Sequence, residues 1–293
     1  MKIIVTGSTG FIGTNFIKNA QDLTIIEVDL LNQTVNEIDF AGIDAVLHLA
    51  ALVHQMKGGQ QEQYFRINRD LALSVAKEAK SRGVKHFVFM STAKVFGEST
   101  TNKKPWNINS ECSPQDAYAR SKLEAEELIF GLEDNNFKVA VVRSPLVYGV
   151  GVKANMFKLM RLVDRYPVLP LGGIQNKRSI VFVGNLIALI KQIIIKNASG
   201  IFIAGDKTSL STTQLTKLIA ESLQKKILLI KIPGFIISFI RMIIPSIVDR
   251  LLGSLEMDNN DTNDKLQFTP PFSSAEGINE MVAWYRSRFN TYN

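Results

Sequence analysis

Short apolar runs alternate with longer amphipathic segments along the first half of the chain. Strands that alternate with helices form a parallel sheet covered on both faces, so this pattern predicts an α/β fold with a doubly wound parallel sheet. Helices are predicted at residues 11–20, from about 66 to 82 with a stop at Gly83, and around Tyr118. Buried strands are predicted where the apolar runs are short and end at turn residues, at residues 2–6, 24–29, 45–49, 86–91 and 139–143.

The pattern changes after about residue 146. Residues 179–183 and 200–204 have the composition of two further strands of the main sheet. Residues 150–177 and 206–293 are more irregular, and Pro recurs in them. We therefore expect a main domain of residues 1–149 plus about 178–205, and a smaller C-terminal, substrate-binding lobe of residues 150–177 and 206–293. A ligand cleft is expected between the two.

Three glycines at a spacing of three follow the first strand and open the first helix: Gly7, Gly10 and Gly13. In this setting glycines allow a tight turn and a close backbone approach, so that a pyrophosphate can bind at the positive helix N-terminus. The turn therefore predicts a Rossmann-type dinucleotide site. Asp29 ends the second strand, where a carboxylate accepts hydrogen bonds from the adenosine ribose and repels a 2′-phosphate. NAD is the expected cofactor and NADP its alternative; the alternative role for Asp29 is that of a solvated turn residue.

Tyr118 and Lys122 lie four residues apart in a segment predicted to be helical. This separation stacks the two side chains on one face of the helix. An ammonium held near a phenol lowers the pKa of the phenol, because it favours the phenolate. Tyr118 could then exchange a proton with a sugar or alcohol oxygen near neutral pH. The pair predicts hydride chemistry, in which a proton leaves an oxygen as a hydride leaves the adjacent carbon.

The composition and charge of the chain limit the kinds of ligand that it is expected to bind. The chain is 46% hydrophobic and 21% charged, with a formal charge of +7. Its basic residues are scattered and form no stripe interleaved with aromatic residues, which disfavours nucleic acid and fits an anionic nucleotide. A single cysteine, Cys112, and three unclustered histidines predict neither a disulfide nor a metal site. No secretory signal is recognised at the N-terminus, so a cytoplasmic protein is expected.

On these residues the chain resembles the extended short-chain dehydrogenases/reductases that remodel nucleotide sugars, the NAD-dependent epimerase/dehydratase family. The resemblance covers most of its length. The matching motifs are the glycine turn, His48–Ala51, Asn68, residues 84–92 and 95–97, the Tyr118/Lys122 pair, residues 143–149, 155–157 and 178–186, and Gly253 with the two residues after it.

The resemblance implies a role for each matching position. Thr92 would hydrogen-bond the reacting sugar oxygen, with Ser91 as the weaker candidate, and Tyr118 would be the acid/base. Lys122 would bind the nicotinamide ribose and tune Tyr118. Arg178 would grip the diphosphate of a UDP-sugar, and Asn155 and Arg250 would be looser nucleotide contacts. The resemblance also implies a homodimer, formed through the two helices that flank the active-site face. Further cofactor-lining positions are Phe11, Ile12, Leu49, Ala50, Ala51, Asn68 and Pro145.

One departure from the family pattern narrows the chemistry. Sugar 4,6-dehydratases of the family carry an Asp-Glu pair just after the catalytic Thr, and this chain has Ala93 and Lys94 there. Without that acid and base, elimination is disfavoured. Residues 51–54, 156–163, 169–173 and 177–179 and the short chain are closest to UDP-4-keto-6-deoxy-N-acetylhexosamine reductases of surface-polysaccharide synthesis. A UDP-glucose or UDP-N-acetylglucosamine 4-epimerase with tightly bound NAD is the rival prediction. A non-catalytic NAD(P) sensor is the remote one, disfavoured by the intact Thr92, Tyr118 and Lys122.

An apolar stretch at residues 227–248 is interrupted by Lys231, Pro233, Arg241 and Pro245. It lacks the roughly 20 uninterrupted apolar residues of a membrane span. A strand followed by a helix of the smaller lobe is the favoured interpretation. The alternative hypothesis is an amphipathic helix that rests on a membrane surface.

Overall fold

The computed structural model describes residues 1–53, 61–243 and 245–289. Its centre is a parallel sheet of six strands in the order β2-β1-β3-β4-β5-β9. The strand order reverses between β1 and β3, and in such sheets ligands bind at the carboxyl ends of the strands that flank the reversal. The strands are β1 (Lys2–Thr6), β2 (Thr24–Val28), β3 (Ala45–His48), β4 (His86–Thr92), β5 (Lys138–Ser144) and β9 (Gly200–Ile203).

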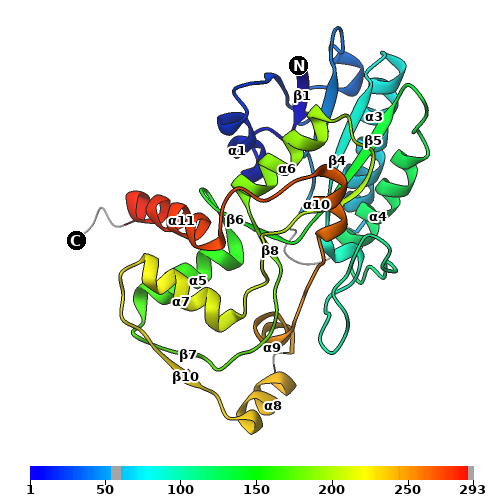
Figure 1. The fold of residues 1–293 in the computed structure, drawn as a ribbon. Coiled ribbons are helices and arrows are strands. Elements are labelled where there is room, and N and C mark those ends of the chain that lie inside the picture. The colour runs from blue at the N-terminus through cyan, green and yellow to red at the C-terminus, as the bar shows by residue number, and fades with distance from the viewer. Residues whose placement is uncertain (54–60, 244, 290–293) are drawn as a thin grey trace.

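Each face of this sheet has its own apolar core, because successive strand residues point to opposite faces. On β4, Val88 and Met90 belong to one core, and Phe87 and Phe89 belong to the other. Helices α1 (Phe11–Asn19) and α6 (Val183–Ile195) contribute to the first core, and α3 (Ala72–Ser81) and α4 (Ala117–Phe130) to the second (Figure 1). The predicted doubly wound α/β fold is therefore confirmed.

The helix predicted from about residue 66 begins earlier and changes its geometry along its length. It comprises α2 (Gln61–Tyr64), a π-helical segment η2 (Phe65–Leu71) and α3. It ends before Gly83, as predicted, and Gly83 has a φ of +82°. π-Helical segments are rare and are frequently found at functional sites. Two short 3-10 helices, η1 (Val35–Glu37) and η3 (Ala93–Val95), lie in connecting loops.

The prediction that residues 179–183 form a strand of the main sheet is wrong. β8 (Ile180–Phe182) instead pairs in parallel with β6 (Leu146–Tyr148) in a separate two-stranded sheet. The edge of β5 is occupied by β9, the other predicted strand, with Ala140 opposite Gly200. Apolar composition identified both runs as strands, but it carries no information about which edge each one pairs with.

A third, two-stranded sheet pairs β7 (Val168–Gly172) with β10 (Leu228–Lys231). Figure 1 shows this sheet, with α5 and α7 beside it, at the end of the molecule opposite β1. None of the described helices is long and apolar enough to cross a membrane. The helices not yet named are α5 (Ala154–Arg165), α7 (Thr212–Ser222), α8 (Gly234–Ile243), α9 (Pro245–Leu252), α10 (Asn260–Leu266) and α11 (Ser274–Phe289).

Candidate active site

The glycine turn lies against the loop that follows β3, at the point where the strand order reverses. Gly7 has a φ of +68°, and a Cβ on it would lie 2.6 Å from the backbone nitrogen of Ala50. A Cβ on Gly13 would lie 2.4 Å from the carbonyl oxygen of Gly7. Only glycine fits at either position, because the neighbouring atoms are backbone atoms that cannot move aside. Leu49 and Ala50, both predicted to line the cofactor site, therefore lie directly against the glycine turn.

The N-terminus of α1 carries the features of an anion site. Gly10 is its N-cap and supplies no side-chain cap, and the first turn contains no acidic residue. The first backbone N–H groups of a helix lack helical partners and carry a partial positive charge. Phe11 and Ile12 are half-buried in this first turn. The arrangement suits a pyrophosphate.

Asp29 follows β2 directly and is exposed. One of its carboxylate oxygens accepts a hydrogen bond from the backbone nitrogen of Leu31 at 3.0 Å, and the other accepts one from Nδ2 of Asn32 at 2.9 Å. The carboxylate is therefore held within its own turn, which is the arrangement expected if Asp29 is a solvated turn residue. Because each oxygen has more than one lone pair, the carboxylate keeps acceptor capacity for a ribose hydroxyl.

His48, at the end of β3, is a buried polar residue that the sequence analysis named only as part of a matching motif, without a role. Its Nδ1 lies 3.0 Å from Oγ1 of Thr6, and that hydroxyl also accepts a hydrogen bond from the backbone nitrogen of Ala50 at 3.3 Å. Burial, together with the nearby charge of Lys122, lowers the pKa of His48 to about 3. His48 is therefore neutral and links β1 to the loop against the glycine turn. A histidine within an otherwise apolar strand was the available signal.

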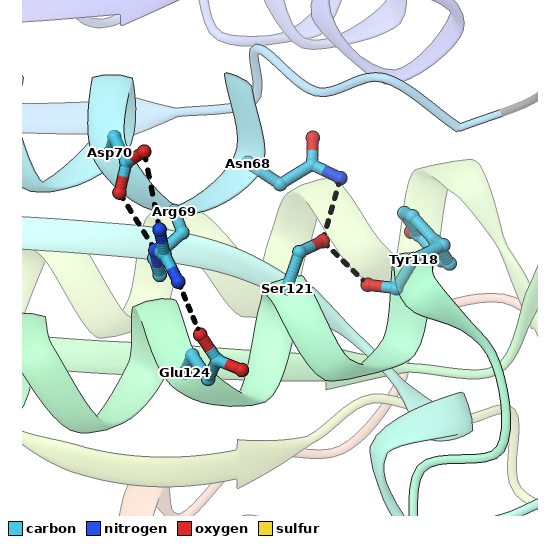
Figure 2. A network of polar contacts seen from close by, with 6 residues as sticks. All are labelled: Asn68, Arg69, Asp70, Tyr118, Ser121 and Glu124. Atoms are coloured by element: carbon cyan, nitrogen blue, oxygen red, sulfur yellow. Dashed lines mark hydrogen bonds and ion pairs between the residues drawn. The ribbon is translucent and has the colours of Figure 1, made fainter. Parts of the chain in front are cut away.

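Asn68 ties the loop after β3 to the helix that carries Tyr118. Its side chain is fully buried, accepts a hydrogen bond from the backbone nitrogen of Leu52 at 2.8 Å and donates one to Oγ of Ser121 at 3.1 Å. The Ser121 hydroxyl donates in turn to the carbonyl of Tyr118 at 2.8 Å (Figure 2). Ala51 is half-buried in the same loop. The network fixes the predicted cofactor loop relative to α4.

A second contact joins the same two elements at the surface. Arg69, next to Asn68, pairs with Glu124 of α4 at 2.6 Å and with its neighbour Asp70 at 2.7 Å (Figure 2). All three side chains are partly exposed, so this contact contributes less to stability than the buried Asn68 network.

Tyr118 and Lys122 lie one turn apart on α4, whose N-cap is the Asp116 side chain. Burial raises the pKa of the Tyr118 phenol to about 12, although a hydrogen bond with the Thr92 side chain acts in the opposite direction. The Lys122 ammonium has its partners on β4. It donates to the carbonyl of Met90 at 2.8 Å and lies 4.4 Å from the centre of the Phe89 ring.

The predicted lowering of the Tyr118 pKa is not seen in this structure, because burial of the phenol raises its pKa instead. Lys122 is itself buried, and burial lowers its pKa to about 7. Both changes have the same cause, since a low-dielectric surrounding disfavours the charged form of each group. The phenol is held in its acid form.

Thr92 and Ser91 end β4 and, as adjacent strand residues, point in different directions. Thr92 hydrogen-bonds Tyr118, whereas the hydroxyl of Ser91 donates to the buried Glu126. Glu126 forms an ion pair of 2.6 Å with Arg143, and both side chains are almost fully buried. The geometry therefore leaves Thr92 for a substrate oxygen and commits Ser91 to the protein interior. The sequence analysis missed the Glu126–Arg143 pair.

Lys94 stands where the family's dehydratases carry an acidic residue. Its ammonium is shared between Asp116 and Glu98, the latter at 3.0 Å. Ala93 beside it is buried. Neither residue offers an acid/base group to a substrate.

The predicted substrate contacts lie farther along the chain. Arg178 is half-buried, and its Nη1 donates to the carbonyl of Gly253 at 3.0 Å. Burial lowers the pKa of its guanidinium. Pro145 is buried directly after β5, and Asn155 is exposed in the first turn of α5. Arg250 belongs to α9, but its side chain, like the whole of residues 54–60 with His54, lies outside what the structure describes.

Comparison with known proteins identifies a protein family that matches this chain. The model of the NAD dependent epimerase/dehydratase family matches residues 17–205. A UDP-glucose 4-epimerase of Vibrio cholerae is 34% identical over 306 residues, covering 95% of this chain and 93% of the relative. The N-acetyl-alpha-D-glucosaminyl-diphospho-ditrans,octacis-undecaprenol 4-epimerase of Escherichia coli O157:H7 is 25% identical over 77% of this chain and 73% of its own length.

Solved structures support the fold. A dTDP-4-dehydrorhamnose reductase from Clostridium acetobutylicum superimposes with a TM-score of 0.79 at 19% identity, covering 98% of this chain and 100% of that one. A UDP-glucuronic acid 4-epimerase from Bacillus cereus in complex with NAD gives 0.77, also at 19% identity, covering 99% and 100%. Reductases and epimerases thus share this architecture.

Proposed function

The chain belongs to the NAD dependent epimerase/dehydratase family, and on that premise we propose that it is an NAD(P)-dependent oxidoreductase acting at C4 of a UDP-sugar. The observation that carries the proposal is the placement of Tyr118 one turn before the buried Lys122 on α4, against the end of β4 that carries Thr92. Thr92 and Tyr118 would hold the sugar O4. Lys122 would bind the nicotinamide ribose.

The residues around the glycine turn fit a dinucleotide. The uncapped N-terminus of α1 offers backbone N–H groups to a pyrophosphate, and the glycines admit the close approach. Bound NAD(P)H supplies a hydride to a carbonyl carbon, or in its oxidised form accepts one from a carbinol carbon. Asp29 favours NAD, since a carboxylate repels the 2′-phosphate of NADP.

Reduction of a UDP-4-keto-6-deoxy-N-acetylhexosamine, a step of surface-polysaccharide synthesis, is our first candidate. The phenol of Tyr118 is held in its acid form, which is the form that a ketone reduction needs. As the hydride reaches C4, the phenol gives its proton to O4 and becomes a phenolate, which solvent then reprotonates. The Thr92 hydroxyl, hydrogen-bonded to the same phenol oxygen, stabilises the phenolate.

The second candidate is a 4-epimerase for UDP-glucose or UDP-N-acetylglucosamine, favoured by the V. cholerae relative, which is matched over nearly its whole length. Tyr118 would then act twice, first taking the O4 proton and then returning it after the ketone has turned over. Elimination gains no support, because Lys94 is engaged with Asp116 and Glu98.

Arg178 is the proposed diphosphate contact. Its planar guanidinium suits two phosphate oxygens, and its structural partner is a neutral carbonyl, so its charge is not neutralised there. We extend the proposal to the domains: residues 1–149 and about 178–205 would hold the dinucleotide, and residues 150–177 and 206–293 the UDP-sugar.

One experiment separates the two candidates. The purified protein is denatured and the released nucleotide is measured, and the native protein is assayed for NADH and NADPH oxidation with a UDP-4-keto-6-deoxy-N-acetylhexosamine. A reductase releases little nucleotide and oxidises the cofactor only when the ketosugar is present. An epimerase releases stoichiometric NAD and interconverts UDP-hexoses without added cofactor. If the protein showed neither behaviour, the proposed activity would be ruled out and the non-catalytic NAD(P) sensor would remain.

A further inference from the structure

Helix α8 presents apolar side chains to solvent on one face. Phe235 and Met242 are each 76% exposed and Ile243 is 62% exposed, with Ile236 exposed beside them. The spacings of seven and eight residues place these four side chains within one stripe of the helix. In a surface helix of a globular protein the apolar stripe normally faces the core. Here these four side chains face outward.

The strand before α8 continues this apolar surface. Leu228 is 60% exposed, is paired in register with the exposed Val168 of β7, and lies two residues from the exposed Ile230. Leu228 and Val168 lie directly opposite each other and therefore share the outer face of the β7–β10 sheet, and Ile230, where the pairing is irregular, is exposed near them. The opposite face is buried through Leu169 and Leu171, which belong to the core below α7. Figure 1 shows β7, β10 and α8 together at the end of the molecule opposite β1.

The same segment is strongly basic. Residues 225–252 contain five basic residues, Lys225, Lys226, Lys231, Arg241 and Arg250, against one acidic residue, Asp249. Lys226 is exposed shortly before β10, and Lys231 is exposed as the last residue of that strand. Lys225 is paired with Asp164, and the other basic residues still outnumber the acidic one. The remaining positive charge repels a second copy of the same surface and attracts an anionic one. Apolar side chains bordered by lysines are the pattern of segments that lie in the headgroup region of a bilayer.

The length of α8 is consistent with lying on a membrane rather than crossing it. Its 10 residues span roughly 15 Å at about 1.5 Å per residue, half of the roughly 30 Å hydrocarbon core. We propose that α8 and the outer face of the β7–β10 sheet dock on an anionic lipid bilayer, with Phe235, Met242 and Ile243 inserted among the headgroups. The inference is independent of the reaction at C4.

The test is sedimentation of the whole protein with vesicles. Vesicles of mixed phosphatidylglycerol and phosphatidylcholine should carry the wild-type protein down at low salt, and vesicles of phosphatidylcholine alone should bind it about tenfold less. Replacing Lys226 and Lys231 by Gln should weaken binding about fivefold per lysine, since each basic residue contributes about 1 kcal/mol at an anionic surface. The double variant Phe235→Asp/Met242→Asp should lower the bound-to-free ratio at least about tenfold.

Leu31→Asp is the matched control, because Leu31 is 92% exposed and precedes β3 in the main sheet's half of the chain; its binding should equal that of the wild type. Equal binding of the wild type to both kinds of vesicle, or none to either, would overturn the proposal, and this comparison needs no variant. Unchanged binding by Phe235→Asp/Met242→Asp would overturn it too. The proposal would also be overturned if light scattering detected a dimer of the wild type that Phe235→Asp/Met242→Asp abolishes. The surface would then be an interface between copies of the chain.

Discussion

Lys122 donates its hydrogen bond to the carbonyl of Met90, 2.8 Å away, from a position that is almost fully buried. A buried ammonium is costly, and the pKa of Lys122, lowered to about 7 by burial, expresses that cost. We expect Lys122→Met, which keeps the volume and removes the charge, to raise the free energy of unfolding by about 1–3 kcal/mol and to abolish turnover. Urea unfolding and the turnover assay check the two effects.

The gain in the free energy of unfolding from Lys122→Met should depend on pH in a definite direction. Since the folded protein holds the Lys122 proton less tightly than the unfolded chain, whose value is near 10.5, the unfolded chain binds more protons between about pH 7 and 10.5. The cost of Lys122 is therefore complete below the folded pKa and fades as the pH rises through that window. The difference between Lys122→Met and wild type should shrink accordingly. A difference that grew with pH would contradict this account.

The buried pair of Glu126 and Arg143 predicts non-additive stability effects. Glu126→Leu leaves Arg143 buried without its carboxylate and removes the acceptor of Ser91, so we expect a loss of about 3–5 kcal/mol. Removing both charges, as in Glu126→Leu with Arg143→Met, should cost less than Glu126→Leu alone. Denaturant midpoints of the two single variants and the double variant supply the comparison. Strictly additive losses would argue that the two side chains act independently.

Local patterns predicted the sheet, the glycine turn and the helix of Tyr118, because each depends on residues close together in sequence. The direction of Lys122 depends instead on Met90 and Phe89 from β4, which lie far from it in sequence. The pairing of β8 with β6 likewise depends on which sheet edge is free. His48 left a signal in sequence, as a polar residue within an apolar strand, whereas Glu126 stands between other glutamates and left none. Their partners Thr6 and Arg143 are visible only in the folded structure.

Gly7 and Gly42 allow backbone strain to be separated from steric conflict. Both have a positive φ, +68° and +67°, but a Cβ on Gly7 would lie 2.6 Å from the backbone of Ala50 and one on Gly42 would meet nothing within 4 Å. Gly42→Ala should therefore cost about 1 kcal/mol, from the left-handed conformation alone. Gly7→Ala should cost roughly 2–4 kcal/mol and weaken NAD(P) binding, because the loop with Ala50 must shift. Thermal unfolding and cofactor titration by fluorescence distinguish them, and equal effects of the two variants would contradict this account.

Tyr118→Phe tests the proton transfer with the least change in shape. The ring remains and only the hydroxyl that hydrogen-bonds Thr92 is lost, so cofactor affinity should stay within about twofold, whereas turnover should fall by about 10²–10⁴. Thr92→Val removes the partner and leaves the phenol, so it should give a smaller loss. Single-turnover rates and cofactor titration of the same preparations give both quantities. If Thr92→Val proved the more damaging of the two, the proton would be carried by the threonine, and Tyr118 would serve only to position it.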